Sequence, residues 1–155
     1  MMNIFWPAIG VGVLSAMVIG FLWYGPLFGK AWAKEVGVDL SKNPPVKEMV
    51  RSMGLMLLGA FLISYCLAHN IEAWRIVMGT FMASGKMPGM QPSHIPMGLA
   101  INSAIWTSVG YFVPVVLNQV AFEQKSWKLF FINVGYYVVT LTAMSFTMAY
   151  WVKTA

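Results

Sequence analysis

The residues of this sequence whose types and spacing best suit chemistry are Met87, Met90, His94 and Met97. Three thioether sulfurs and one imidazole in a short segment suit a soft metal ion such as Cu(I). Methionine is frequent in this chain, however, with 13 in all, and it also fills apolar gaps or contacts lipid. Gap filling or lipid contact is the preferred role of these methionines, so no cofactor is expected and a copper site stays an alternative.

The other reactive side chains do not form a catalytic arrangement. His69 and His94, the two histidines, have no motif-like serine or cysteine neighbour, and Cys66 is the single cysteine. A nucleophile needs a base within reach, and a proton relay needs ionisable groups at membrane depth. The carboxylates lie where interfaces or loops are expected: Glu35, Asp39, Glu48, Glu72 and Glu123. We therefore predict that the protein is not an enzyme.

The composition indicates an integral membrane protein. Of the 155 residues, 59% are hydrophobic and 10% are charged, and the mean hydropathy is +0.68. A soluble domain carries about 25% charged residues. The net charge of +5 comes from basic residues beside apolar segments, where they meet anionic headgroups and not nucleic acid. Membrane lipid is the expected partner, and no small-molecule ligand is indicated.

The predicted fold is all-α, an integral membrane four-helix bundle with short interfacial helices in the loops. A helix needs about 20 apolar residues to cross the hydrocarbon of a bilayer. Four intervals of about this length are free of acidic and basic side chains, and we expect residues 1–155 to form a single transmembrane domain. The predicted spans are about 4–24, 49–69, 97–119 and 129–152.

Gly25-Pro26 predicts the end of the first span, because proline disfavours helical geometry in the residue before it. In the stretch that follows, Phe28, Trp32 and Val36 recur four residues apart, while lysines take the other sides. This pattern is typical of a short helix that lies in the membrane interface.

A second interfacial helix is predicted from Ile71 onward, beyond a membrane boundary at His69-Asn70. Glu72 and Arg75 have the i, i+3 spacing of an ion pair within it.

Two sets of small residues predict close helix contacts. Gly12, Ala16 and Gly20 recur every four residues in the first span, and Ala60, Ser64 and Ala68 have the same spacing in the second. Small side chains on one face let helices approach closely within a membrane.

The third and fourth spans each carry a stripe that steps alternately by four and three residues, the seam of a left-handed helix pair. We expect the two stripes to face each other, with Asn118 and Asn133 at similar depth. The first stripe is Ala100, Ala104, Thr107, Tyr111, Pro114 and Asn118; the second is Asn133, Tyr137, Thr140, Met144, Thr147 and Trp151.

The distribution of basic residues predicts the orientation of the chain in its membrane. Four spans put the loop after the first span and the hairpin at 123–128 on one side. That side holds Lys30, Lys34, Lys42, Lys47, Arg51, Lys125 and Lys128, against Arg75, Lys86 and Lys153 on the other. The positive-inside rule then places both termini outside the cytoplasm.

Two segments of the chain resemble a family of small bacterial membrane proteins known as domain of unknown function 1761. The first, here named the elbow segment, is Phe21, Leu22, Trp23, Tyr24, Gly25, Pro26, Leu27, Phe28, Gly29, Lys30, Ala31 and Trp32. The second, the hairpin segment, is Phe122, Glu123, Gln124, Lys125, Ser126, Trp127, Lys128, Leu129, Phe130, Phe131, Ile132, Asn133, Val134, Gly135 and Tyr136. Trp151 resembles the closing aromatic of the family. The resemblance implies a four-span fold and a bacterial membrane, and it implies no activity.

Three function classes remain. The first is a structural or interaction protein of the cytoplasmic membrane, whose elbow segment contacts lipid or a partner. The second is a homo-oligomeric pore or small-solute transporter, with a polar path along the seam and Gly12, Ala16 and Gly20 as the contact between copies. The third and lowest-ranked is an extracytoplasmic Cu(I)-binding membrane protein.

Overall fold

The computed structural model describes residues 6–85 and 97–154. Within these ranges the chain is helical and contains no strand. The elements are α1 (Trp6–Leu22), a π-helical turn (Trp23–Leu27), α2 (Gly29–Val36), α3 (Val46–Ala83), α4 (Met97–Thr107), a second π-helical turn (Ser108–Phe112), α5 (Val113–Phe122) and α6 (Trp127–Thr154).

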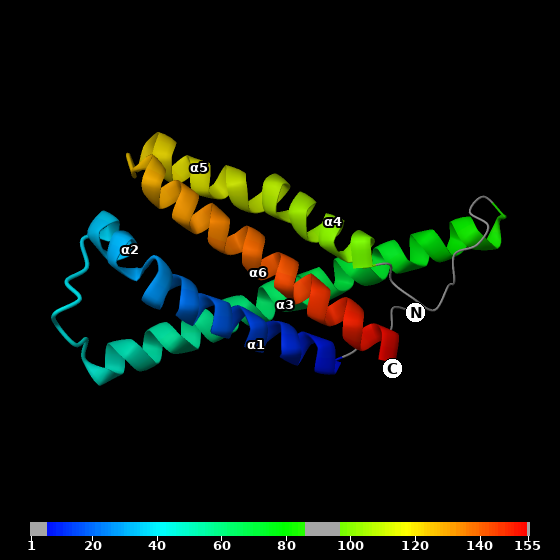
Figure 1. Cartoon of the computed structure of the whole chain (residues 1–155), viewed down its shortest axis with the longest axis horizontal. Helices are drawn as coiled ribbons and strands as arrows, with labels where there is room; N and C mark the ends of the chain where they lie inside the picture. Colours follow the sequence, from blue (N-terminus) through cyan, green and yellow to red (C-terminus); the bar gives the residue numbers. More distant parts are fainter. Residues whose placement is uncertain (1–5, 86–96, 155) are drawn as a thin grey trace.

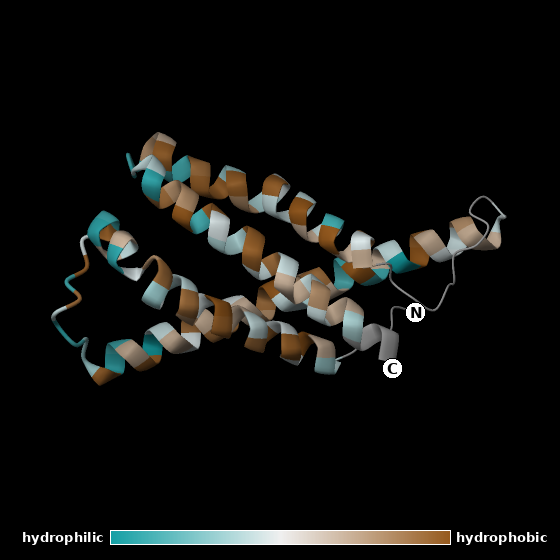
Figure 2. Cartoon of the chain, in the orientation of Figure 1, coloured by the Kyte–Doolittle hydropathy of each residue, from teal (hydrophilic) through white to brown (hydrophobic). Residues whose placement is uncertain are grey.

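Four helical segments among the described residues are long and apolar enough to cross a membrane: Trp6–Leu27, Val46–Ala83, Met97–Phe122 and Trp127–Tyr150. Hydrophobic residues run along all four, while hydrophilic ones gather at the end that carries α2 and the loop after it (Figure 2). The predicted all-α, four-helix membrane bundle is therefore confirmed.

The helix α6 contacts every other helix and forms the centre of the bundle. One end of the molecule, here named the loop end, holds α2, the loop 37–45 and the hairpin between α5 and α6 (Figure 1). The C-terminus lies toward the opposite end. The first loop and the hairpin, which we predict to share one side of the membrane, thus lie at one end of the molecule.

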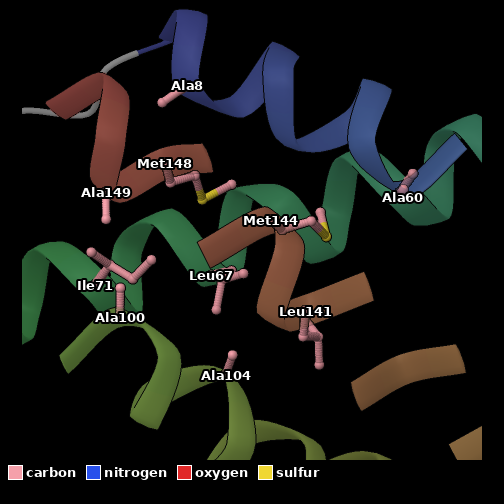
Figure 3. Close-up of a cluster of buried hydrophobic side chains, with 11 residues drawn as sticks. Ala8, Ala60, Leu67, Ile71, Ala100, Ala104, Leu141, Met144, Met148 and Ala149 are labelled. Atoms are coloured by element: carbon pink, nitrogen blue, oxygen red, sulfur yellow. The ribbon is translucent and has the colours of Figure 1, made fainter. Parts of the chain in front are cut away.

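The core is built from small side chains and methionines where α1, α3, α4 and α6 meet (Figure 3). Leu67 of α3 and Leu141, Met144 and Met148 of α6 are buried, and alanines from all four helices surround them. Small residues allow the helix axes to approach, and flexible methionine side chains fill the irregular space between them.

The predicted close contact of the first span is confirmed, and it lies within the chain. Gly12 and Gly20 are buried; a side chain at Gly12 would meet Ser64 of α3 and Met148 of α6. The Ser64 hydroxyl donates a hydrogen bond of 2.8 Å to the Ile9 carbonyl. This face of α1 is already covered, so it does not provide the contact between copies that the pore hypothesis assigned to it.

The helix α3 corrects the prediction of a separate interfacial helix from Ile71. It runs without a break through 38 residues, a length of about 57 Å. His69 and Asn70 do not interrupt it, because polar side chains leave the backbone hydrogen bonds intact, and Nδ1 of His69 lies 2.9 Å from the Tyr65 carbonyl oxygen. No proline, which would remove a backbone hydrogen bond, occurs within Val46–Ala83 to end the helix.

Gly25-Pro26 does not end the first span, which also corrects a prediction. The chain passes through Pro26 in a π-helical turn, closed by a hydrogen bond of 2.8 Å from the Phe28 N–H to the Trp23 carbonyl. The wider turn accommodates a residue that has no N–H and would crowd an α-helical turn. The break comes at Phe28, with φ −119° and ψ 1°, immediately before α2.

The predicted seam between the third and fourth spans is correct at some positions and wrong at others. Ala100 and Ala104 are buried as predicted. The π-helical turn at Ser108–Phe112 then adds one residue, which rotates all later side chains by about 100°. Tyr111 and Asn118 therefore face outward, and Phe112 and Val116 take the inward positions.

Candidate functional site

The elbow segment and the hairpin segment, nearly a hundred residues apart in the sequence, contact each other through two hydrogen bonds. The indole N–H of Trp23 donates to the Ile132 carbonyl at 3.0 Å. The Tyr24 hydroxyl donates to Oδ1 of Asn133, also at 3.0 Å. Both acceptors lie on the first turns of α6, so the two bonds hold the π-helical turn at Trp23–Leu27 against that helix.

Gly135 leaves the space that the Trp23 ring occupies. A β-carbon at Gly135 would lie 2.9 Å from Cζ2 of Trp23, closer than non-bonded carbons approach. At Gly20 of α1, just before the elbow segment, a β-carbon would lie 3.4 Å from the Tyr136 hydroxyl oxygen, an ordinary van der Waals distance. Gly135 thus gives room to an aromatic ring of the facing helix.

An aromatic cluster surrounds Tyr24 at this contact. The ring centroids of Tyr24 and Tyr136 are 5.0 Å apart, and those of Tyr24 and Trp32 are 5.7 Å apart in an edge-on arrangement. Trp23 and Phe28 lie at 4.6 Å. Such pairs stabilise beyond their buried area. The aromatic rings around Tyr24 are therefore engaged with one another.

A polar contact links α2 to the hairpin at the loop end. Glu35 accepts a hydrogen bond of 2.5 Å from the Ser126 hydroxyl, and its other oxygen lies 3.7 Å from Nζ of Lys128. Ser126 in turn accepts a hydrogen bond from the Leu129 N–H and caps α6. The sequence pattern predicts Glu35 at the interface but not its partners, because only the fold brings α2 to the hairpin.

The predicted seam residues divide into two groups. Phe112 and Tyr137 stack at a centroid distance of 4.2 Å, and Thr140 and Met144 are buried. Asn118, in contrast, is exposed, whereas Asn133 binds Tyr24 of the first span. The prediction that Asn118 and Asn133 face each other is wrong, because the π-helical turn shifts the register between them.

Two ion pairs lie outside the signature segments, Arg75 with Glu72 and Lys42 with Asp39. Arg75 and Glu72 form the predicted i, i+3 pair, with two hydrogen bonds of 2.6 Å, and Glu72 is only 6% exposed. In the loop 37–45, hydrogen bonds donated by the Ser41 hydroxyl and N–H hold the pKa of the Asp39 carboxyl below its usual value.

The proposed copper ligands Met87, Met90 and His94 lie outside the described residues, and Met97 begins α4. Across 6–85 and 97–154, no three side chains from histidine, cysteine, aspartate and glutamate gather as a metal site would require.

The fold and the elbow contact describe a small all-α protein with four described helices long and apolar enough to span a membrane, in which a π-helical turn at the end of the first is held against the last. The chain belongs to the family described as "Protein of unknown function (DUF1761)", whose model matches residues 7–149. The family resemblance is therefore confirmed. No curated protein and no solved structure matches the chain.

Replacing Tyr24 by phenylalanine tests the elbow contact. We expect a loss of about 1 kcal/mol of stability, because the partly buried Asn133 side chain loses its hydrogen-bond donor. The matched control is Tyr111→Phe, whose side chain is 70% exposed and whose loss of a hydroxyl should be neutral. Thermal unfolding in detergent measures both, and equal transition temperatures would contradict a stabilising role for this bond.

Proposed function

We propose that this protein is a multi-pass protein of the bacterial inner membrane, with its loop end in the cytoplasm and both termini outside. The observation that supports this orientation is the charge at the two ends. Seven basic residues belong to the loop end: Lys30, Lys34, Lys42, Lys47, Arg51, Lys125 and Lys128. Three basic residues, Arg75, Lys86 and Lys153, belong to the rest of the chain. Cytoplasmic loops carry such an excess.

Its role in this proposal is structural or interactive and not catalytic. The family signature supports this, because Trp23, Tyr24 and Gly135 serve to join the first span to the last. The carboxylates of Glu35 and Glu72 are likewise engaged with basic or hydroxyl groups. The elbow contact thus builds a rigid loop end that presents α2 and the loop 37–45 at the cytoplasmic surface.

Cysteine labelling in cells tests the orientation. In a Cys66→Ala background, Lys42→Cys and Gln124→Cys should react with a membrane-impermeant maleimide only after the membrane is opened. Both positions are exposed at the loop end, so a lack of reaction in intact cells reports on the membrane and not on burial. A tag after Ala155 should be accessible in intact cells. Labelling of Lys42→Cys in intact cells would show that the loop end lies outside the cytoplasm and would contradict the proposed orientation.

A second candidate is a homo-oligomeric pore or small-solute transporter, favoured by the polar groups on the outer side of the third span. Tyr111, Thr107 and Asn70 line two adjoining hollows of about 460 and 410 Å³ between α3 and the third span. Tyr111 and Asn118 are exposed, and polar groups toward lipid leave hydrogen bonds unmade. A second copy packed on this face would supply partners.

Self-cross-linking tests this second candidate. Tyr111→Cys in the Cys66→Ala background should form a disulfide-linked dimer in membranes, since a two-fold contact brings the same residue of both copies together. Phe21→Cys, on the exposed side of α1 at 75% exposure, is the matched control. Equal cross-linking at both positions, or release of a small solute no faster than from empty liposomes, would reject an oligomeric pore.

A further inference from the structure

The two adjoining hollows between α3 and the third span differ in chemistry. The one of about 410 Å³ is here named the amide hollow. The one of about 460 Å³ is named the apolar hollow. Both volumes are within the range of ligand sites in proteins. The hydrogen-bonding and aromatic side chains that line the amide hollow include Asn70, Trp74, Asn102, Trp106, Thr107 and Tyr111.

The amide hollow lies about one hydrocarbon thickness away from the loop end. The helix α4 meets α3 at the buried Ile71 and Ala100 (Figure 3). Next to this contact, Asn70 and Asn102 are exposed. Asn70 follows Arg51 by about 20 residues, and Asn102 precedes the hairpin by about the same number, which is about 30 Å of helix in both cases. Because the hydrocarbon of a bilayer is about 30 Å thick, both amides reach the headgroup level on the side opposite the loop end.

The lining of the amide hollow is polar but uncharged. Within the described part of the chain, the side chains of Asn70, Asn102 and Tyr111 form no hydrogen bond. Trp74 and Trp106 each follow one of the two asparagines by one helical turn, so each amide has an indole on the same face of its helix.

These side chains match a ring that carries several hydroxyl groups. A side-chain amide both donates and accepts hydrogen bonds, as a hydroxyl does, and an indole offers a flat apolar face with one N–H. No acidic or basic side chain lines the amide hollow, so a phosphate group would find no cation there. The chemistry therefore favours a neutral sugar over the headgroup of a phospholipid.

The apolar hollow continues from the amide hollow toward the middle of the membrane. The two share Asn70, Thr107 and Tyr111. The remaining side chains of the apolar hollow are Leu62, Ile63, Cys66, Leu67, Phe112 and Leu141. Those from α3 precede Asn70 by one to two helical turns, so they lie closer to the loop end and deeper in the hydrocarbon. A polar site at headgroup level thus adjoins an apolar one at acyl-chain level.

A second copy of the chain fits these hollows less well than a lipid does. A two-fold contact brings the same surface of both copies together, so each hollow would face an identical hollow. Neither concave surface would then be filled. A lipid molecule, in contrast, reaches both hollows directly from the bilayer.

We propose that the two hollows together bind a glycolipid, with its uncharged sugar headgroup in the amide hollow and an acyl chain in the apolar hollow. This inference rests on the proposed membrane location and names the class of lipid that the protein binds. Asn70 and Asn102 exchange hydrogen bonds with the sugar hydroxyls. Trp74 and Trp106 cover the apolar faces of the sugar ring. In the proposed orientation, the bound glycolipid belongs to the outer leaflet.

Native mass spectrometry of the full chain, in a polyoxyethylene detergent that has no sugar group, tests this proposal. Glucosyl-dioleoylglycerol, dioleoylphosphatidylglycerol and dioleoylphosphatidylcholine are titrated separately. The glucolipid should bind at about tenfold lower concentration than either phospholipid, because only its headgroup finds hydrogen-bond partners in the amide hollow. Equal affinity for the three lipids would overturn the proposal. So would a dimer that binds no lipid, since a second copy would then occupy this face.

Matched variants test the amide hollow. Asn102→Leu should weaken glucolipid binding about tenfold, whereas Asn118→Leu, an exposed amide of the same span outside both hollows, should leave it unchanged. Trp106→Leu should also weaken binding, and Trp6→Leu, whose side chain is exposed to a similar extent in α1, should not. All four side chains are exposed, so the fold tolerates these changes. Unaltered binding to Asn102→Leu and Trp106→Leu, or equal losses in the two controls, would overturn the proposal.

A further variant tests the apolar hollow. Cys66→Trp should fill it and weaken glucolipid binding about tenfold, whereas Leu58→Trp, which is also exposed on α3 but lies outside both hollows, should leave binding unchanged. Unaltered binding to Cys66→Trp would overturn the placement of the acyl chain. Because lipid preference is measured in detergent and orientation in cells, failure of either result is distinguishable from failure of the other.

Discussion

Replacing Gly12 by alanine is expected to destabilise the protein by about 2 kcal/mol, since overpacking a close contact typically costs 1–3 kcal/mol. The new β-carbon would lie 2.5 Å from the Ser64 hydroxyl oxygen and 2.7 Å from Cε of Met148. Ser64 cannot simply turn away, because its hydroxyl is buried and donates to the Ile9 carbonyl. The change would therefore separate α1 from both α3 and α6.

Gly10→Ala is the matched control for this prediction. Gly10 belongs to the same helix, is exposed, and has no atom within 4 Å of its missing β-carbon. Alanine is favoured over glycine in a helix by up to about 1 kcal/mol, so this variant should be as stable as the wild type or slightly more stable. Thermal unfolding in detergent compares the two variants. A transition temperature of Gly12→Ala at or above that of Gly10→Ala would contradict a stabilising role for the close contact at Gly12.

The spans could be predicted from the sequence because lipid imposes length and charge limits on any crossing helix. The close contact of α1 could likewise be predicted from the sequence, since Gly12, Ala16 and Gly20 recur every four residues. The repeat does not identify the helix that packs against these small residues. It suggested a second copy as well as another helix, and only the fold shows that α3 and α6 cover this face.

Prolines caused the main errors of register. Pro26 and Pro114 each lie inside or just after a π-helical turn, which lets the helix continue where an α-helical turn would be crowded. A sequence pattern shows the proline but not how the backbone relieves the steric crowding that the proline causes. The inserted residue moved Tyr111 and Asn118 outward, so a stripe that was regular in sequence became two stripes in space.

The elbow contact was only half visible in the sequence. Family resemblance singled out the elbow and hairpin segments separately, but nothing in either segment states that Trp23 donates to Ile132 or that Gly135 makes room for it. Such a contact depends on which helices are neighbours, a long-range property that periodicity does not encode. The same holds for Glu35, whose partners Ser126 and Lys128 are more than 90 residues away.

Replacing Gly29 by alanine is expected to have the largest effect on the elbow, a loss of about 3 kcal/mol at the upper end of the range for overpacking. A β-carbon at Gly29 would lie 2.5 Å from the backbone oxygen of Tyr24. A backbone atom cannot turn aside as a side chain can. The π-helical turn at Trp23–Leu27 or the break at Phe28 would have to open, and Trp23 and Tyr24 would leave their acceptors on α6.

Gly25→Ala tests whether this effect is specific. Gly25 lies in the same segment, and no atom comes within 4 Å of its missing β-carbon, so alanine there should be tolerated. In Gly29→Ala, the unfolding temperature and the tryptophan fluorescence should both change. In Gly25→Ala, neither should change. A Gly29→Ala protein that keeps the wild-type unfolding temperature would show that the elbow can relax locally. The contact between the first and last spans would then be too weak to hold the loop end.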